Sequence, residues 1–428
     1  MKKIKAVPLS IPADGADGAL DVTAPAADRR VTGLEKWLAH RVLETLGAPP
    51  INIILWDGQE IAGSTSAPVA RVRVRDRGAF YKLLINRDLQ LGELYSGGRI
   101  EIDGNLVRFL EIAYVATTQA SRINSLKKYV SRIMNRPRVN TLAGSKSNIH
   151  HHYDISNEFY ALWLDHEMQY TCAYFPNPGM SLEAAQIAKM DHVCRKLRLK
   201  PGDTVVEAGC GWGGLARHMA THYGAQVRAY NISHEQIAYA RERAKREGLS
   251  ERVEYVEDDY RTISGSYDVF VSVGMLEHVG HDHYRELGDV IDRSLTHCGR
   301  GLIHSIGRNR PGKLNPWIEK RIFPGAYPPS LREMMEVFEP HQFSVLDVEN
   351  LRLHYAKTLE HWLARFQEHT DRIDKMFDQD FVRAWRLYLA GSITAFTAAS
   401  LQLFQVTFAR PRDNEIPWNR AHLYGSEH

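Results

Sequence analysis

The stretch from 204 to 273 constrains the fold most, because short apolar segments alternate there with amphipathic ones over short links. It predicts strands at 204–208, 226–230, 253–256 and 269–273, and helices at 215–223 and 234–245. A strand, a helix and a strand joined by short links require parallel pairing and a right-handed crossover. The stretch therefore predicts an α/β protein with a doubly wound, Rossmann-like sheet whose ligand binds at the carboxyl ends of the strands.

A glycine loop, GCGWGG at 209–214, follows the first of these strands and satisfies the GxGxxG pattern. A dinucleotide site would need an acid about 20 residues further on, at the end of the second strand. That strand ends with Tyr230 and Asn231, neither of which is acidic, whereas Glu207 stands just before the loop. This arrangement favours the methyl donor S-adenosylmethionine over a dinucleotide, with a purely structural glycine turn as the third alternative.

The 428 residues suffice for two or three domains. We predict a mobile tail rich in Ala, Asp and Pro at 1–28 and a small mixed α+β domain at 29–118. The α+β domain rests on predicted strands at 53–55, 69–75 and 100–102 and on an Asp57-Gly58 turn. A basic linker at 119–150 then leads to the methyltransferase-like domain at 151–428.

The net charge of +3 conceals an uneven distribution. Residues 112–153 contain no Asp or Glu, and their basic residues are Arg122, Lys127, Lys128, Arg132, Arg136, Arg138 and Lys146. Apolar residues recur at helical spacing there, which predicts a basic amphipathic helix that can lie on anionic lipid. The alternative is a connecting helix packed on a neighbouring domain. Nucleic acid is disfavoured as a partner, because no nucleic-acid motif accompanies the charge.

The four cysteines, Cys172, Cys194, Cys210 and Cys298, have no CxxC spacing. This usage argues for a reducing compartment and against a disulfide scaffold or a cysteine zinc site, so no metal is expected. No uncharged apolar run reaches the roughly 18 residues that a membrane helix needs. We therefore expect a cytoplasmic protein that does not span a membrane.

Five ordered motifs resemble those of the cyclopropane-fatty-acyl-phospholipid synthase family: YTCAYF at 170–175, GCGWGG at 209–214, DYR at 259–261, GMLEHVG at 274–280 and LIHSIG at 302–307. Further resemblances are HHYDISNEFY at 151–160, the segments 316–318 and 323–325, and LQLFQ at 401–405. The resemblance is close over about 145–410 and looser over the N-terminal domain.

The resemblance implies transfer of a methyl group from S-adenosylmethionine to a cis double bond of an unsaturated phospholipid at the inner face of the membrane. The resulting carbocation would lose a proton to bound bicarbonate and close a cyclopropane ring. Aromatic faces can stabilise such a cation, and the candidates are Tyr160, Tyr174, Phe175 and Tyr355. A methylene- or methyl-branched fatty acid is the alternative product, because it starts from the same cation.

The resemblance also implies the site residues. The expected catalytic residues, which would also hold bicarbonate together with the Ile306 backbone, are Cys172, Glu277, His304 and Tyr355. The expected cofactor residues are Tyr170, Thr171, Glu207, Gly209, Gly211, Asn231, Gln236, Asp259 and Tyr260. Glu207 stands where the family usually has Asp, and Asn231 replaces a usual Thr. Cys194 and Cys298 match no family position and are expected to be structural.

Two rivals come from other classes of protein. A nicotinamide oxidoreductase would use the same glycine pattern but would lack its acid at Asn231. A lipid-binding or scaffold protein without activity would have little use for the proposed bicarbonate set. The N-terminal domain resembles one that assists dimerisation, so a homodimer is a further expectation.

Overall fold

The computed structural model of this chain describes residues 30–64, 67–123 and 156–424. The predicted tail and most of the predicted basic linker lie outside the described residues. Contacts divide the chain into two compact units. The first unit contains the chain up to 134, 315–322 and 366–394, and the second unit contains the remainder. The second half of the chain thus contributes two segments to the N-terminal unit.

The first unit contains a four-stranded sheet in the order β2-β1-β3-β4. Its strands are β1 (Ile51–Ile54), β2 (Glu60–Ile61), β3 (Ala70–Val74) and β4 (Ile100–Gly104). β1 and β2 form the hairpin predicted around Asp57-Gly58, β1 and β3 are parallel, and β3 and β4 are antiparallel. Its helices are α1 (Gly33–Thr45), α2 (Arg77–Ile85), α3 (Arg87–Ser96), α4 (Leu106–Ile123), α13 (Pro316–Arg321) and α16 (Thr370–Met376).

Local sequence explains several of these elements. Thr32 and Glu35 form a capping box that starts α1, and the Asp76 carboxylate accepts the Ala79 N–H to start α2. In β3 the apolar residues are buried while Arg71 and Arg73 face outward, which is the alternation that the sequence shows. Helix α4 continues through the predicted domain boundary at 118.

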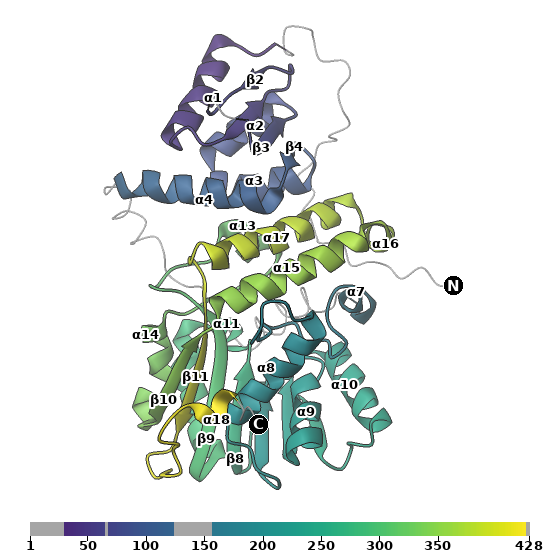
Figure 1. The fold of residues 1–428 in the computed structure, drawn as a ribbon, viewed down its shortest axis with the longest axis vertical. Helices are drawn as coiled ribbons and strands as arrows, with labels where there is room; N and C mark the ends of the chain where they lie inside the picture. Colours follow the sequence, from purple (N-terminus) through teal and green to yellow (C-terminus); the bar gives the residue numbers. More distant parts are fainter. Residues whose placement is uncertain (1–29, 65–66, 124–155, 425–428) are drawn as a thin grey trace. The chain divides into compact units, whose positions relative to one another are not determined.

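The second unit is built on a seven-stranded sheet in the order β10-β11-β9-β8-β5-β6-β7 (Figure 1). The strands are β5 (Thr204–Ala208), β6 (Gln226–Asn231), β7 (Val253–Glu257), β8 (Tyr267–Val273), β9 (Leu295–Gly307), β10 (Ser344–Asn350) and β11 (Gln402–Ala409). The helices are α7 (Asn157–Ala161), α8 (Leu182–Lys196), α9 (Gly214–Tyr223), α10 (His234–Arg246), α11 (Leu276–Val279), α12 (Tyr284–Ser294), α14 (Leu331–Met334) and α18 (Ala421–Tyr424).

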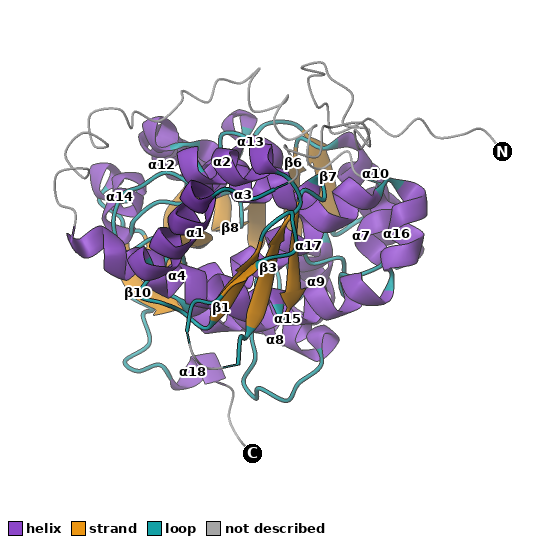
Figure 2. Cartoon of the chain, turned by 90° about the horizontal axis from the view of Figure 1, so that it is seen from above, coloured by secondary structure: helices purple, strands orange, loops and turns teal. Residues whose placement is uncertain are grey.

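Alternate residues of the central strands serve two cores, because helices cover both faces of this sheet. Val205 packs in the core that contains side chains of α8, α9 and α10. Its neighbour Val206 packs in the opposite core, with side chains of α12. Five strands from β7 to β9 pair in parallel. The predicted α/β fold with a doubly wound sheet is therefore confirmed. Figure 2 distinguishes the helices of the chain from its strands by colour.

The C-terminal part of the sheet was not predicted. β9 pairs with β11 and β11 pairs with β10, both antiparallel. Two long helices, α15 (Arg352–Glu368) and α17 (Gln379–Thr397), separate β10 from β11 in the sequence, and each has residues in both units. In the described ranges, no helix combines the length and the apolar character needed to cross a membrane.

Candidate active site

The glycine loop lies at the carboxyl end of β5, as the strand–helix alternation predicts. The N–H groups of Gly209 and Cys210 both donate to the Tyr230 carbonyl, at 2.9 and 3.1 Å, which fixes the loop to β6. Gly211 has φ +53° and open space where a side chain would begin. Gly213 has φ +74°, and a Cβ there would lie 2.4 Å from the Tyr255 hydroxyl. Gly213 thus allows close packing, whereas Gly211 leaves one side of the loop open for a ligand.

Three polar side chains around this loop are buried and each has an atom without a hydrogen-bond partner in the described part of the chain. These atoms are Oε2 of Glu207, Nε2 of Gln236 and the Tyr260 hydroxyl. Burial raises the pKa of Glu207 to about 7, against the lowering effect of Lys189 and Arg217. Buried polar atoms of this kind normally have partners. A carboxylate, an amide donor and a hydroxyl fit the amino group and nucleoside of S-adenosylmethionine.

Two other expected cofactor residues bond to neighbours in this structure. Asn231 donates to Oε1 of Gln236 at 2.7 Å and to the Gly211 carbonyl at 3.3 Å. Asp259 accepts the Arg261 N–H at 3.0 Å and also pairs with the Arg261 guanidinium at 3.2 Å. Asn231 therefore positions Gln236 and the loop, and the Asp259 carboxylate is engaged by Arg261.

The segment that carries Tyr170, Thr171 and Cys172 is held by two buried side chains of α8. Gln186 donates to the Thr171 carbonyl at 2.9 Å. The Lys189 ammonium donates to Oγ1 of Thr171 at 3.0 Å and also to Oε1 of Gln169. Both α8 residues are fully buried. Sequence reasoning missed this support, although Lys189 stands in the apolar stripe of α8, an unusual place for a lysine.

Lys189 links the two halves of the site electrostatically. Burial lowers its pKa to about 8, while the nearby acidic groups Asp165, Cys172 and Glu207 act in the opposite direction. Its charge in turn lowers the pKa of Glu207 and the pKa of the Cys172 thiol, although burial still raises both. A single buried ammonium thus lies within electrostatic range of the glycine-loop acid and of the expected bicarbonate thiol.

Glu277 follows the carboxyl end of β8, and His304 lies on β9 opposite Val273, the last residue of β8. The Ile306 N–H donates to Oε1 of Glu277 at 2.5 Å, and Oε2 of Glu277 is buried without a partner among the described residues. Burial raises the pKa of Glu277 to about 7. Burial and nearby lysines lower the pKa of His304 to about 3. The His304 ring is therefore neutral at physiological pH.

The His304 tautomer follows from its neighbour on β11. The Gln405 amide donates to Nδ1 of His304 at 3.0 Å, so the ring proton belongs on Nε2. That N–H is a donor suited to an anion. The sequence motif at 401–405 contains Gln405, but only the antiparallel pairing of β9 and β11 explains its role.

Cys172 and Tyr355 share a backbone neighbour, the Leu351 carbonyl. It accepts the Tyr355 N–H at 3.1 Å and lies 3.9 Å from the Cys172 sulfur. Leu351 is in turn bonded to Leu403 of β11 at 2.8 Å. The His304 ring and the Cys172 thiol also share Lys189 and Glu349 as charged neighbours. Through Leu351, Cys172 and Tyr355 are thus joined to β11, the strand whose Gln405 contacts His304.

The four aromatic candidates for cation stabilisation differ in their surroundings. Tyr174 stacks on His192 at 4.1 Å and on His354 at 5.0 Å between ring centroids. Phe175 stacks on His361 at 5.7 Å. These ring contacts explain both residues by packing alone, without a role in stabilising a cation. Tyr160 lies in a buried aromatic cluster with Trp212 of the glycine loop at 5.0 Å, and Tyr355 contacts Phe396 at 4.7 Å.

The His192 ring that stacks on Tyr174 also contacts Glu349 and the C-terminal helix α18. Nε2 of His192 lies 2.7 Å from Glu349, whose pKa His192 and Lys196 lower to about 2 despite its burial. Nδ1 of the same ring faces the Leu423 carbonyl of α18 at 3.4 Å, and Arg195 donates to that carbonyl at 2.8 Å. Leu423 is thereby joined to the helix that carries Lys189.

Comparison with known proteins gives one family for most of the chain. The mycolic acid cyclopropane synthetase family matches residues 141–406, and a domain of unknown function matches residues 38–125. The chain is 38% identical over 362 residues to a cyclopropane-fatty-acyl-phospholipid synthase of Escherichia coli, covering 83% of this chain and 92% of that protein. It is 34% identical over 391 residues to a "Probable fatty acid methyltransferase" of Pseudomonas putida, covering 88% and 96%.

A solved structure agrees with these sequence matches. This chain resembles the mycolic acid cyclopropane synthase CmaA1 in its complex with SAH and CTAB. The TM-score is 0.59 at 29% identity, covering 62% of this chain and 98% of that one.

Proposed function

This chain belongs to the mycolic acid cyclopropane synthetase family, and on that premise we propose that it methylates a cis double bond of an unsaturated phospholipid to form a cyclopropane fatty acid. The chain is an S-adenosylmethionine-dependent methyltransferase. The observation that carries the proposal is the buried Oε2 of Glu277, which has no hydrogen-bond partner in the part of the chain that the structure describes.

The methyl donor supplies an electrophilic methyl group when it is bound. Glu207, Gln236 and Tyr260 would hold it through the buried atoms for which the described ranges offer no partner, with Gly209 and Gly211 letting the backbone approach. An alkene is a weak nucleophile, so the chain's contribution is to hold the double bond in line and to exclude water. The burial of the surrounding side chains supports that role.

The proton of the new methyl group must leave to close the ring. We propose that Glu277, His304, Cys172, Tyr355 and the Ile306 backbone hold a bicarbonate ion as the base. Donation from Nε2–H of His304 would orient the anion, and Oε2 of Glu277 would accept its proton. Because the Ile306 N–H donates to Glu277 in this structure, we propose that this hydrogen bond rearranges when the anion binds.

The test is incubation with vesicles of a defined unsaturated phospholipid, with and without bicarbonate, followed by proton NMR of the acyl chains. A cyclopropane signal that weakens after bicarbonate removal would support both parts of the proposal. A methylene signal would establish the branched product instead of the cyclopropane. Release of no S-adenosylhomocysteine with any lipid would overturn the proposed function.

We also propose a place of action, the inner face of an anionic membrane. Support comes from the acid-free basic segment at 112–153, most of which lies outside the described residues. Replacing Lys127, Lys128, Arg132 and Arg136 by Gln should weaken binding to anionic vesicles, most clearly at low salt. Equal vesicle binding by the variant and the parent would favour the alternative interpretation, in which the segment packs on a neighbouring domain. A homodimer stays a proposal, testable by light scattering.

A further inference from the structure

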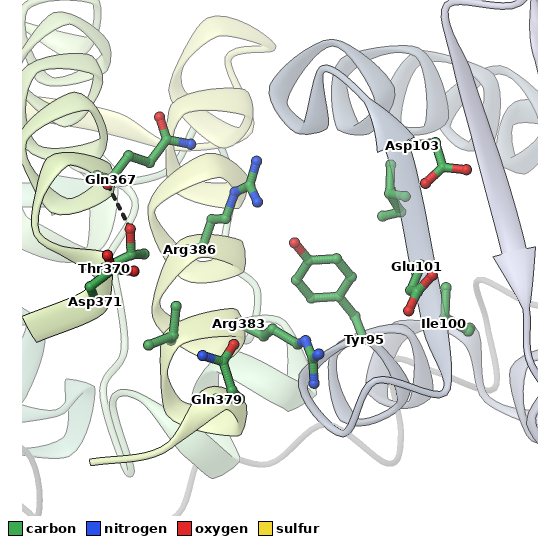
Figure 3. A pocket seen from close by; sticks show the side chains of 12 residues that line it. Tyr95, Ile100, Glu101, Asp103, Gln367, Thr370, Asp371, Gln379, Arg383 and Arg386 are labelled. Carbon is green, nitrogen blue, oxygen red and sulfur yellow. Dashed lines mark hydrogen bonds between the residues drawn. The ribbon is translucent and has the colours of Figure 1, made fainter. Parts of the chain in front are cut away.

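The first unit contains a cavity of about 620 Å³ that the proposed chemistry does not use (Figure 3). All of its lining residues belong to this unit: Tyr95, Ile100, Glu101, Ile102, Asp103, Gln367, Thr370, Asp371, Gln379, Val382, Arg383 and Arg386. Tyr95 reaches from α3 toward α17, which carries Arg383 and Arg386.

Arg383, Arg386 and Tyr95 supply hydrogen-bond donors to one side of the cavity, which we call its positive corner. Nε of Arg386 is buried and has no hydrogen-bond partner among the described residues. Arg383 is one third exposed, and its ion-pair distance to Asp380 is long, 3.7 Å. Tyr95 is only 7% exposed, and both arginines lie close enough to act on its phenol. Burial nevertheless raises the pKa of Tyr95, so its hydroxyl keeps a proton to donate.

The acids on the opposite wall do not cancel this positive corner, because other arginines already neutralise them. Arg75 pairs with Glu101 at 2.6 Å, and Arg73 pairs with Asp103 at 3.1 Å. Two guanidinium groups and a phenol therefore face the cavity with donors, and Asp371 is the lining acid that remains to offset part of their charge. Guanidinium groups bind phosphate oxygens by paired hydrogen bonds, for which this corner is suited.

The volume of the cavity further limits the range of ligands that could bind there. A volume of about 620 Å³ exceeds what a lone inorganic phosphate would fill and lies in the range of organic ligands. We propose that this cavity binds the glycerophosphodiester head group of a phospholipid, with Arg383, Arg386 and Tyr95 holding the phosphate. The proposal rests on the proposed function for its choice of a lipid and adds the part of the substrate that is recognised.

The direct test measures binding of soluble head-group probes to the full chain by calorimetry. The probes are glycerophosphoethanolamine, glycerol 3-phosphate and inorganic phosphate. We expect the glycerophosphodiester to bind, inorganic phosphate to bind more weakly, and the double variant Arg383→Gln/Arg386→Gln to bind at least about tenfold more weakly than the parent. Tyr95→Phe keeps the ring and should weaken binding about threefold through loss of one donor.

Arg41→Gln is the matched control, because Arg41 is an exposed arginine of α1 in the same unit and does not line the cavity. S-adenosylmethionine binding and the melting temperature of each variant show whether the fold is kept. Equal probe binding by the parent and the double variant would overturn the proposal, as would inorganic phosphate binding as tightly as the glycerophosphodiester.

A second measurement separates this inference from the proposed function. With dioleoyl phosphatidylethanolamine vesicles, the double variant should raise KM at nearly unchanged kcat, whereas turnover of methyl oleate in micelles should not change. Equal losses on both substrates would exclude head-group recognition at this cavity. If no lipid were methylated by any form of the protein, the proposed function would fail, while the calorimetric result would still decide whether the cavity binds the phosphodiester.

Discussion

The charged side chains of the active-site region in the second unit are buried, whereas those at the cavity of the first unit are partly exposed to solvent. Around the glycine loop, Glu207, Lys189 and Glu277 are at most 5% exposed, and two of the three acidic or basic groups have pKa values near 7 because of burial. At the cavity, Glu101, Asp103 and Arg383 are between one third and one half exposed, and the two acids pair with arginines. Charge in the first region is governed by desolvation, and charge in the second by water and salt.

The sharpest test of the buried region is Glu277→Gln. Turnover, measured as S-adenosylhomocysteine release, should fall about 10²- to 10³-fold, because the anion's proton loses its acceptor. The loss should be the same at low and high salt, and cofactor binding should change little. Glu254→Gln is the control, since Glu254 is an exposed acid of β7. Unchanged turnover would remove Glu277 from the chemistry.

The pH dependence of cofactor binding tests the desolvated acid. Because burial raises the pKa of Glu207 to about 7, the cationic amino end of the cofactor should bind about tenfold more weakly for each pH unit below that value. Glu207→Gln should abolish this dependence. The stability of the cofactor-free protein should fall as the pH rises from about 4.5 to about 7, because the folded state retains a proton that the unfolded state releases. A flat binding profile for the parent would contradict the assignment.

Lys189→Met tests whether the buried ammonium connects the two halves of the site. Loss of its hydrogen bonds to Thr171 and Gln169 should weaken cofactor binding at pH 7 about fivefold. Loss of its charge should also move the pH midpoint of binding upward, since Lys189 lowers the pKa of Glu207. Lys200→Met provides a control on an exposed lysine. Weaker binding without the midpoint shift would reduce Lys189 to a packing residue.

The smallest expected effect belongs to the exposed region. Arg73→Gln removes the pairing with Asp103, whose atoms are about half exposed. The free energy of unfolding in urea should change by less than about 1 kcal/mol, and the change should shrink further in high salt. A large loss of unfolding free energy that did not depend on salt would show that this ion pair behaves like the buried charges of the active-site region.

Sequence alone predicted the part of the fold in which residues interact with close neighbours in the chain. The bounds of β5 match the prediction, and β6, β7 and β8 extend it by one to two residues. The β9–β11–β10 edge could not be predicted, because antiparallel pairing there joins strands separated by α15 and α17. Because this edge was not predicted, the role of Gln405, which fixes the His304 tautomer, was not predicted either.

The candidate site shows the same limit. Glu207 and Glu277 stand in or next to recognisable motifs, and Gln236 was implied by the resemblance; among the described residues each has a buried atom without a partner that suits the expected ligand. Lys189 carries no motif, and its partners come from a loop about 20 residues earlier that has no regular structure. The cavity joins Tyr95 to Arg383, residues that only the folded chain brings together.

The attachment of α18 to α8 connects α18 to a loop that lies far from it in the sequence. The Leu423 carbonyl receives Arg195 and faces His192, and His192 stacks on Tyr174 in the segment that also carries Cys172. A truncation that removed Leu423 would leave His192 and Arg195 without this acceptor. Such a truncation is expected to lower turnover without removing any of the expected catalytic residues.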